Sequence, residues 1–301
     1  MKLTRETGLP MANKAAVFFL STGRCGTQWF EKALAEVYSD RAVVTHEPVK
    51  ADYEPRKFLR AYDDLHLLLD NPAVSEHLRS IRGTLPKYIY IETGWPCYPA
   101  IPLFIEKLEK VKVVHVVRHP VRVALSLATH KVYSRTDWIS NAALTPHDHG
   151  VVNRADWRDW EELTTFEKCL FWWTEINAYA LEVRSIFDAA QYHFVRFEDI
   201  FANEGSALEE LTDFIGLPYR HVLGKRKAKC VDTFKYTTEA VDWRLIDKYP
   251  GTLSLMDKFG YSSSDYNSGA IKRRYFSPLG SVVKDSLGKM IRRVDLLRGR
   301  I

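Results

Sequence analysis

The chain has 301 residues, 46% of them hydrophobic and 27% charged, which fits one large domain or a domain with appendages. The formal net charge of +5 is uneven, because nine Lys or Arg against three Asp give residues 262–301 a charge of +6 and leave −1 for residues 1–261. The basic balance therefore gives no argument for a nucleic-acid-binding body. No stretch approaches the roughly 18 consecutive apolar residues of a membrane-spanning helix, and residues 1–14 contain no apolar signal region.

The first predicted elements are a strand and a helix joined by a turn with two glycines. Residues 15–20 form an apolar run typical of a buried strand, and residues 29–37 have a helical pattern. The connecting sequence is Ser21-Thr22-Gly23-Arg24-Cys25-Gly26-Thr27-Gln28-Trp29. Its glycines let the backbone approach an anion, and the helix N-terminus offers unpaired N–H groups. It lacks the Gly-Lys-Ser/Thr of a Walker loop. The pattern therefore predicts a phosphate-binding turn, with an ordinary strand-to-helix turn as the alternative.

The next two predicted strands bring a candidate base toward this turn. Residues 41–45 form the second strand and end at His46-Glu47-Pro48, and residues 87–92 form the third. A titratable pair at a strand end is well placed for acid–base chemistry. Because adjacent strand residues point to opposite faces, we expect only one of the two to face an acceptor. The alternative is that Glu47 caps a turn before Pro48. Residues 93–96, which leave the third strand, are expected to border the acceptor.

A further buried strand, residues 111–117, runs into Arg118-His119-Pro120 and a helical pattern over residues 121–130. The proline fits the first turn of that helix, where a missing N–H costs nothing. Arg118 then lies at the C-terminal end of a strand, the edge at which open α/β sheets bind ligands, and Ser126 follows about two helical turns later. Each residue alone has an ordinary alternative: Arg118 could form a surface ion pair, and Ser126 could simply occupy a position on a helix face. His115, inside the strand, is expected to be a satisfied core or edge histidine.

An irregular region and a long helix follow. Residues 134–160 are irregular and rich in Trp, His and Asp, so they are expected to form a lid or substrate loop. Their tryptophans at 138, 157 and 160 suit a sugar or an aromatic acceptor. His147-Asp148-His149 could bind a metal, but a solvated loop is the stronger interpretation because no further Cys or His falls at ligand spacing. Residues 161–187 are predicted as a helix whose apolar face belongs to the core.

Strands and helices alternate from residue 15 to residue 132, which favours a parallel sheet with crossover helices. Within this order, two motifs resemble the sulfotransferase family, whose donor is 3′-phosphoadenosine 5′-phosphosulfate (PAPS). Residues 21–29 are similar to the family's 5′-phosphosulfate loop, with Arg24 in place of the usual lysine and Cys25 in place of serine. Arg118 and Ser126 have the spacing of its 3′-phosphate motif. Later segments over residues 194–217 and 255–261 also resemble the family, so the resemblance runs from residue 15 to residue 261 in the right order.

The resemblance implies an α/β, P-loop-like three-layer fold with a central parallel sheet flanked by helices. It also implies that Arg24 and the N–H groups of residues 26–28 hold the 5′-phosphosulfate, that Trp29 lies near the adenine, and that Arg118 and Ser126 grip the 3′-phosphate. An Arg fork suits that phosphate because it can bond two oxygens at once. The implied donor-binding set is Thr22, Gly23, Arg24, Cys25, Gly26, Thr27, Gln28, Trp29, Arg118 and Ser126, with no metal.

The resemblance also suggests the base. Carbohydrate-type members often carry a Glu-Pro pair at this place, with the glutamate as base, which points to Glu47. The soluble small-molecule branch uses a histidine instead, for which His46 is the candidate. The implied catalytic residues are therefore Glu47, Arg24 and His46. Sulfuryl transfer requires positioning, charge neutralisation and a base for the acceptor proton, and each requirement has a candidate in this set.

The resemblance implies a sulfotransferase that moves a sulfuryl group from PAPS to an acceptor hydroxyl of a carbohydrate, a glycolipid or a small metabolite. Two other classes stay open. A nucleotide-dependent kinase also uses a phosphate-binding turn before a helix, although the missing Gly-Lys-Ser/Thr and the Arg118/Ser126 pair count against it. A non-catalytic nucleotide-binding module on an inactive sulfotransferase fold would bind the donor without transfer.

We expect three parts: an N-terminal extension (1–14), a sulfotransferase domain (15–261) and a basic tail (262–301). Apolar residues recur at helical spacing beside lysines and arginines in the tail, so it is expected to pack on the body or a partner subunit, or to lie on an anionic membrane surface as an amphipathic helix. Gly280 and Gly288 favour the packed form. Four widely spaced cysteines without a CxxC pattern favour reduced thiols and a cytoplasmic location.

Overall fold

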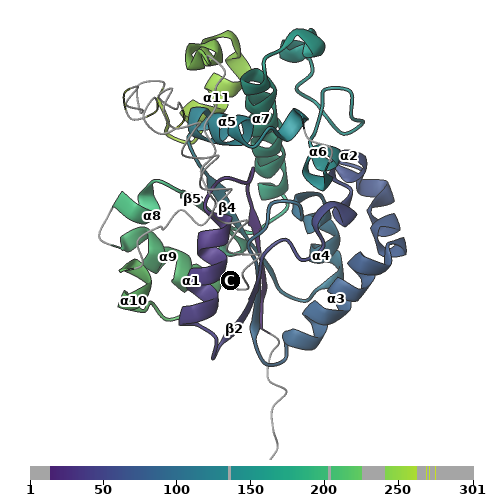
Figure 1. Ribbon diagram of the computed structural model, residues 1–301. Coiled ribbons are helices and arrows are strands. Elements are labelled where there is room, and N and C mark those ends of the chain that lie inside the picture. Colours follow the sequence, from purple (N-terminus) through teal and green to yellow (C-terminus); the bar gives the residue numbers. More distant parts are fainter. Residues whose placement is uncertain are drawn as a thin grey trace, which may run out of the picture.

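Five parallel strands form the central sheet, in the order β2-β3-β1-β4-β5 (Figure 1). The computed structural model describes residues 14–134, 137–202, 205–225 and 241–262, together with residues 269, 271 and 275. The strands are β1 (Ala16–Leu20), β2 (Ala42–Thr45), β3 (Ile89–Glu92), β4 (Val111–Val117) and β5 (Tyr192–Arg196). The register places Glu92 opposite Phe18 of β1 and opposite Thr45 of β2, so these three strands end close together.

Helices cover both faces of the sheet. In Figure 1, α1 and α8 to α10 lie on one side and α3 and α4 on the other, while α5 and α11 each pack against α7. The predicted α/β fold, with a central parallel sheet between helical layers, is confirmed. The helices are α1 (Thr27–Val37), α2 (Pro55–Phe58), α3 (Pro72–Thr84), α4 (Ile101–Lys107), α5 (Pro120–Thr129), α6 (Trp138–Ala142), α7 (Thr165–Arg184), α8 (Asp199–Ala202), α9 (Ser206–Ile215), α10 (His221–Gly224) and α11 (Pro250–Lys258).

β1 and β4 form where the sequence has long apolar runs. All five residues of β1 are buried, and so is β4 except for Lys112. A parallel strand covered by helices on both faces needs apolar side chains at every position, so its sequence does not alternate. For this reason β4 has the predicted bounds, and β1 and β3 fall within two residues of theirs. The edge strand β2 also falls within two residues of its predicted bounds, although only Ala42 of it is buried.

The long helix α7 begins at Thr165, four residues after the predicted start. A capping box sets this start: the N–H of Glu167 donates to the hydroxyl oxygen of Thr164 (3.3 Å), and the N–H of Thr164 donates to the Glu167 carboxylate (3.0 Å). Residues 161 and 162 belong instead to a short 3-10 turn. The apolar face of α7 is buried as predicted, and Trp173 is among its fully buried residues.

His115 of β4 is a satisfied core histidine, as predicted. Its Nε2 lies 2.9 Å from Oδ1 of Asn177, and its Nδ1 lies 2.7 Å from the hydroxyl of Tyr192. Burial lowers the pKa of this imidazole to about 4, so it is neutral near pH 7. The residue therefore contributes to the core and takes no part in the edge where the strands end.

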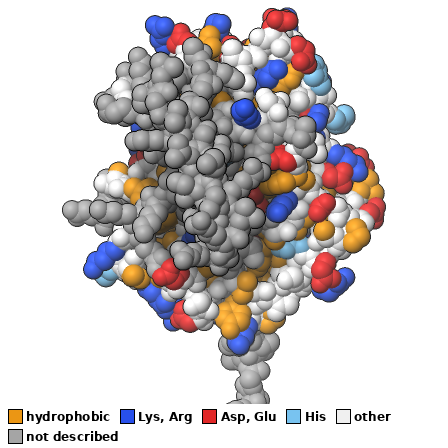
Figure 2. Space-filling model, in the orientation of Figure 1, with side chains coloured by type: hydrophobic (Ala, Val, Ile, Leu, Met, Phe, Trp, Pro, Cys, Tyr) orange, Lys and Arg blue, Asp and Glu red, His pale blue; other side chains and the backbone are white. Residues whose placement is uncertain are grey.

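Charged side chains of both signs are interspersed over the described part of the face in Figure 2. This agrees with the near-zero charge that the sequence gives to residues 1–261. Within the described ranges, no helix has both the length and the apolar character needed to cross a membrane. The predicted basic tail, apart from residues 262, 269, 271 and 275, lies outside the described residues, and so does the N-terminal extension up to residue 13.

Candidate functional site

The segments that carry the predicted site residues meet at one edge of the sheet. Because all five strands are parallel, β1 leads into residues 21–26, β2 into residues 46–47, β3 into residues 93–94 and β4 into Arg118 at the same edge. β1 is the middle strand, with β3 on one side and β4 on the other. Open α/β sheets bind ligands in the crevice outside the carboxyl ends of their strands, at such a point of reversal.

The turn after β1 is shaped by left-handed backbone conformations. Gly23 has a φ of 72°, Arg24 of 58° and Gly26 of 78°. A Cβ on Gly26 would lie 2.2 Å from the ring of Phe197, so this position excludes a side chain on steric grounds as well as by its φ. The glycine motif found in the sequence therefore has a geometric cause, which is the close approach of the turn to a ring that follows β5.

Two side chains of the turn point into the protein and fix its shape. Thr22 and Cys25 are buried, with 3.5 Å between the Thr22 hydroxyl oxygen and the Cys25 sulfur, and the thiol donates to the carbonyl of Gly23 (3.2 Å). The indole N–H of Trp172 donates to the carbonyl of Thr22 (2.9 Å) and ties the turn to α7. Burial raises the pKa of the Cys25 thiol to about 11. Any contribution of Cys25 to a ligand therefore comes from its backbone.

Helix α1 presents an open N-terminus at this turn. Its first intrahelical bonds run from the N–H groups of Trp29 and Phe30 to the carbonyl of Gly26, at 2.9 and 3.0 Å. Within the described structure no side chain caps this end, and the first turn holds no acidic residue. The helix has 11 residues, so the unpaired N–H groups and the positive end of its dipole make this end suited to an anion.

The predicted 5′ and 3′ motifs are in direct contact. Nε of Arg24 donates to the hydroxyl oxygen of Ser126 (2.9 Å), and Nη1 of Arg118 donates to the carbonyl oxygen of Arg24 (2.8 Å). Nε of Arg118 is buried and has no hydrogen-bond partner within the described residues. A buried donor of a charged group without a partner is costly, so this atom suits an anionic ligand.

Phe197 is a residue of this site that the sequence reasoning gave no role. The guanidinium carbon of Arg118 lies 5.0 Å from the centroid of the Phe197 ring, which is cation–π range, and the same ring lies against Gly26. The indole N–H of Trp173 also donates to the carbonyl of Arg118 (2.9 Å). The segment with Phe197 showed a family resemblance, but only the three-dimensional packing shows that its ring contacts both motifs.

Trp29, the residue expected near the adenine, packs into the wall of the site. Its indole is 7% exposed and contacts the rings of Phe30 and Phe201 edge-on, with centroids 5.1 and 4.9 Å away. Phe201 itself is 42% exposed, so the aromatic wall reaches the surface through that ring. The placement of an adenine at this wall stays a prediction.

The expectation that His46 and Glu47 point to opposite faces is wrong. β2 ends at Thr45, so both residues lie beyond the strand, and Glu47 has a left-handed φ of 50°. The alternation rule needs extended backbone at both positions, and this turn breaks it. Nε2 of His46 consequently lies 3.6 Å from Oε1 of Glu47, and both side chains keep a small exposed fraction, 18% and 17%.

Gly94 accommodates the left-handed turn at Glu47. A Cβ built on Gly94 would lie 2.5 Å from Cγ, 2.7 Å from the backbone nitrogen and 2.9 Å from Cα of Glu47. Two of these atoms belong to the backbone, so a side-chain rotation of Glu47 could not relieve the overlap. The segment after β3, which was expected to border an acceptor, therefore packs directly against the candidate base.

The irregular region contributes one partly exposed tryptophan to the site. Trp138 of α6 stacks on Trp95 at an interplanar angle of 12° and a centroid distance of 5.9 Å, and Trp95 lies beside Gly23. The other two tryptophans of this region are buried, Trp157 at 1% and Trp160 at 6% exposure. The expectation that they suit an acceptor is wrong, because both are core residues.

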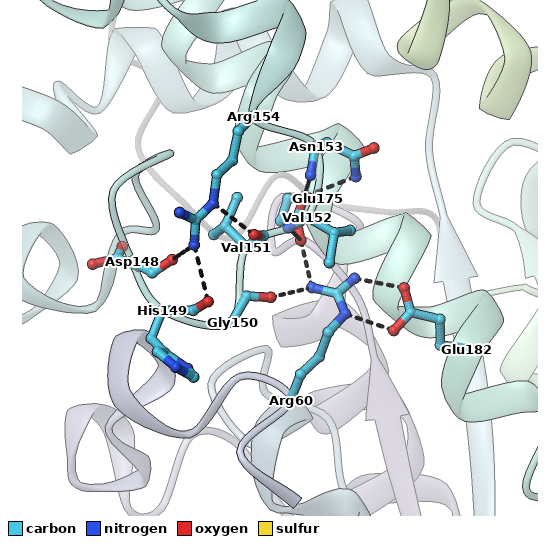
Figure 3. Close-up of polar contacts among 10 residues, drawn as sticks. All are labelled: Arg60, Asp148, His149, Gly150, Val151, Val152, Asn153, Arg154, Glu175 and Glu182. Atoms are coloured by element: carbon cyan, nitrogen blue, oxygen red, sulfur yellow. Dashed lines mark hydrogen bonds and ion pairs between the residues drawn. The ribbon is translucent and has the colours of Figure 1, made fainter.

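Figure 3 shows how residues 148–154 of the same region are held on the protein. Arg60 donates from Nη1 to the buried carboxylate of Glu175 (2.5 Å) and to the carbonyl of Gly150 (2.6 Å). Its Nε and Nη2 donate to the Glu182 carboxylate at 2.6 and 2.7 Å. We call this set the Arg60 clamp. It joins the segment after α2, residues 148–154 and α7, so that part of the predicted lid is fixed in place.

The metal interpretation of His147 and His149 receives no support from the described residues. Nowhere in the described ranges do three or more His, Cys, Asp or Glu side chains lie together as a group that could hold a metal ion. Asp148, between the two histidines, instead accepts hydrogen bonds from the backbone and hydroxyl of Thr145 (2.7 and 3.2 Å) and pairs with Arg56 (2.8 Å).

The chain belongs to the sulfotransferase family. A family model described as "Sulfotransferase domain" matches residues 14–238, a range that contains the turn after β1, Glu47, Arg118 and Ser126. The protein is therefore of the class that transfers sulfuryl groups. The resemblance found in the sequence is confirmed at the level of the family.

Several solved structures are similar to this chain. They include the sulfotransferase from Alicyclobacillus acidocaldarius, with 13% identity, coverage of 83% of this chain and 98% of that chain, and a TM-score of 0.49. The sulfotransferase domain from the curacin biosynthetic pathway has 16% identity, coverage of 88% and 99%, and a TM-score of 0.42. Mouse sulfotransferase SULT7A1 complexed with PAP has 14% identity, coverage of 82% and 82%, and a TM-score of 0.42. None of the curated proteins matches the chain significantly.

Proposed function

We propose that this chain transfers a sulfuryl group from PAPS to an acceptor hydroxyl, with Glu47 as the base. The observation that supports this most is the contact between the two candidate motifs. Arg24 of the turn bonds Ser126 of α5, and Arg118 bonds the carbonyl of Arg24. A nucleotide that carries phosphates on both the 3′ and the 5′ oxygen requires two anion sites side by side.

The residues present suit such a donor. The open N-terminus of α1 and the guanidinium of Arg24 would take the 5′ group, because both offer N–H donors and positive charge. Arg118 and Ser126 would take the 3′-phosphate, and the buried Nε of Arg118 would gain the partner that it lacks among the described residues. Thr27 and Gln28, at the start of α1, would add side-chain donors. A nucleotide without a 3′-phosphate would leave the Arg118 donor buried and unpaired, which costs free energy.

When bound, PAPS would supply the sulfuryl group and a phosphate leaving group. The protein's own contribution is electrostatic and positional. Arg24 and the N–H groups of the turn would stabilise negative charge on the leaving oxygen. Glu47 would accept the acceptor's hydroxyl proton at a carboxylate oxygen. His46 is less suited to that task, because its Nδ1 faces the hydroxyl of Thr93 (3.3 Å) and its Nε2 faces Glu47 (3.6 Å).

The acceptor is proposed to be a neutral hydroxyl compound, either a carbohydrate, a glycolipid or a small metabolite. The partly exposed indole of Trp138, which stacks on the buried Trp95 beside the turn, gives a flat apolar surface that suits a sugar face or an aromatic ring. The charge of residues 1–261 is close to zero, which does not suit a nucleic-acid acceptor. Contact of the basic tail with a membrane or a second copy stays a proposal.

Calorimetric binding of 3′-phosphoadenosine 5′-phosphate (PAP), AMP and ATP tests the donor site. We expect PAP to bind more tightly than AMP or ATP. The variant Arg118→Ala should lose at least about tenfold in PAP affinity, because a hydrogen bond to a charged group contributes about 1.5–3 kcal/mol. The matched control is Arg79→Ala, whose side chain is 70% exposed on α3 and should leave PAP binding unchanged.

The outcomes separate the competing functions. Equal affinity for PAP and AMP, or no effect of Arg118→Ala, would contradict the donor assignment. Tighter binding of ATP with magnesium-dependent turnover would favour a kinase. A non-catalytic module would be favoured if PAP binding depends on Arg118 but no sulfuryl transfer from PAPS is found. That result requires that neither the wild type nor Glu47→Gln transfers the group to any screened hydroxyl acceptor.

A further inference from the structure

The segment that carries the candidate base has an unusual backbone. Between residues 47 and 60, four residues other than glycine have a positive φ: Glu47 (50°), Lys50 (52°), Glu54 (44°) and Arg60 (58°). A left-handed conformation costs free energy in a residue with a Cβ, and it persists only where surrounding contacts hold the chain in place. Such residues cluster at active sites and ligand clamps. The contacts that hold this segment therefore bear on the function of the site.

Tyr53 anchors the middle of this segment. It is the last residue of a short 3-10 helix, η1 (Lys50–Tyr53), which begins at the left-handed Lys50 and is followed by the left-handed Glu54. The Tyr53 side chain is fully buried. Its hydroxyl donates to the carboxylate of Glu92, at 3.1 Å from Oε1 and 3.2 Å from Oε2. The strained turn thus depends on a hydrogen bond to one buried carboxylate.

Glu92 connects this anchor to the sheet and to α3. It is the last residue of β3 and is fully buried. Nε2 of His77 on α3 lies 2.9 Å from its Oε2, and the hydroxyl of Tyr90 lies 3.2 Å from the same oxygen. A buried carboxylate is costly unless it has such partners, so these contacts account for its place in the core. Glu92 therefore joins Tyr53 to a strand and a helix at once.

Two parts of the proposed site depend on the place of η1. The helix begins three residues after Glu47, and the turn at Glu47 is limited on its other side by Gly94. In space, η1 packs against α6, which carries the Trp138 indole of the proposed acceptor surface. A displacement of η1 would therefore move the candidate base and the acceptor surface relative to the turn after β1.

We propose that Glu92 is a positioning residue: through Tyr53 it fixes η1, and so it sets the place of the Glu47 carboxylate and of the Trp138 surface. This inference rests on the proposed function, in which Glu47 is the base. Glu92 is fully buried, so its effect on transfer is exerted through Tyr53 and η1. The sequence placed Glu92 at the end of a predicted strand and gave it no role.

Two pairs of matched variants test the proposal in the full-length chain. Tyr53→Phe removes the hydroxyl and keeps the ring. Its control is Tyr179→Phe on α7, because the Tyr179 hydroxyl is also buried but has no hydrogen-bond partner among the described residues. Glu92→Gln keeps an oxygen that can accept from Tyr53, whereas Glu92→Met removes the acceptor at a similar size.

Two measurements report positions without an acceptor. Hydrogen exchange of the Asp52 and Glu54 amides reports on η1, because these N–H groups donate to the carbonyls of Val49 (3.2 Å) and Ala51 (2.8 Å). Exchange of the amides of β4, a buried central strand, is the reference for global unfolding. The ¹³C resonance of the Glu47 carboxyl, assigned with Glu47→Gln, reports on the surroundings of the candidate base.

In Tyr53→Phe and Glu92→Met, we expect exchange of the Asp52 and Glu54 amides to accelerate by at least about tenfold more than exchange of the β4 amides, because a lost hydrogen bond to a charged group releases η1 locally. The Glu47 carboxyl resonance should shift in both variants. Glu92→Gln and Tyr179→Phe should leave both readouts near the wild-type values. If Tyr53→Phe accelerates the η1 amides no more than the β4 amides and leaves the Glu47 resonance unchanged, the contact serves overall stability alone and the proposal is overturned.

Transfer kinetics and PAP binding separate this proposal from the function on which it rests. With PAPS as donor and 2-naphthol as the acceptor probe, kcat should fall by at least about tenfold in Tyr53→Phe while PAP affinity stays unchanged, because a small misplacement of a catalytic group is costly. An unchanged kcat would refute the positioning role. A protein without preference for PAP over AMP would refute the donor assignment and leave the exchange rates and the Glu47 resonance as measured. If Glu92→Met does not fold, the two Tyr→Phe variants still decide the question.

Discussion

The Arg60 clamp offers a direct test of how residues 148–154 are held in place. The perturbation is Arg60→Met, which keeps much of the side chain's length and apolar stem but removes the charge and all its donors. In the wild-type protein the Arg60 side chain is 10% exposed, and the Glu175 carboxylate that it contacts is fully buried. The variant would leave that carboxylate buried among neutral donors only: the N–H groups of Val152 and Asn153 and the Asn153 amide.

The expected magnitude follows from this burial. Removal of one partner from a buried ion pair typically costs about 3–5 kcal/mol, because the remaining charge stays desolvated without a counter-charge. The second ion pair of Arg60 adds little, because the Glu182 side chain is 42% exposed and such pairs contribute about 0–1 kcal/mol. We therefore expect Arg60→Met to lower the free energy of unfolding by about 3–5 kcal/mol, and Glu182→Ala by no more than about 1 kcal/mol.

Equilibrium urea unfolding, followed by both tryptophan fluorescence and circular dichroism, gives the measurement. The decisive variant is Arg60→Met combined with Glu175→Gln, because glutamine removes the unpaired charge while keeping an oxygen for the neighbouring N–H groups. This double variant should recover most of the loss seen in Arg60→Met. A loss below about 1 kcal/mol in Arg60→Met, or a double variant no more stable than the single one, would refute the assignment of the clamp as a buried ion pair.

Three further predictions concern single positions. Gly94→Ala should reduce the rate of sulfuryl transfer by about 100-fold and leave PAP affinity unchanged, because Glu47 must shift by about 1 Å to relieve the overlap. The control is Gly83→Ala on α3, where a Cβ meets nothing within 4 Å. This control should leave the free energy of unfolding unchanged or raise it slightly. His115 has a folded-state pKa of about 4, below the ordinary value of about 6.5, so it contributes stability above pH 6.5 that is lost as the pH falls toward 4. Wild-type stability in urea should thus fall by roughly 2 kcal/mol more than that of His115→Gln between pH 7 and pH 5; equal losses would contradict this. Cys25 should resist alkylation by iodoacetamide at pH 8 in the folded protein, because its thiol is buried and has a pKa of about 11. Peptide mass spectrometry measures the modification. Rapid modification of Cys25 would contradict the prediction and show that the turn opens.

The three middle strands of the sheet were predictable because β1, β3 and β4 are buried on both faces. Residues 111–117 read as an unbroken apolar run apart from Lys112 and His115, and the strand has those bounds. The turn after β1 was predictable for a related reason: its glycines are required by left-handed φ values, and that requirement is visible in the sequence. Both signals are local, so neither depends on which distant segments pack together.

The rest of the site depends on long-range packing and could not be predicted. The ring of Phe197, which follows the edge strand β5, contacts Arg118 at the end of the neighbouring strand β4 and Gly26 in the turn after β1. Trp157 was assigned to a lid or substrate loop because the region is irregular and rich in Trp, His and Asp, yet it is buried and stacks on Tyr249 at a centroid distance of 3.9 Å. In both cases the partner lies far away in the sequence, and composition alone gives no information about it.

A left-handed backbone conformation explains why the arrangement of His46 and Glu47 was predicted wrongly. The same conformation occurs in the turn after β1 and in the Arg60 clamp. The described residues include six non-glycine residues with positive φ, three of which are Arg24, Glu47 and Arg60, with φ of 58°, 50° and 58°. Each costs on the order of 1 kcal/mol and persists only where other contacts hold it. Arg118 bonds the Arg24 carbonyl, Gly94 leaves room for Glu47, and Glu175 pairs with Arg60. These positions require a charged side chain and a left-handed backbone together, a combination that glycine cannot supply. Local rules assign the left-handed region to glycine and asparagine, so they fail at the positions where this protein combines charge with an unusual backbone.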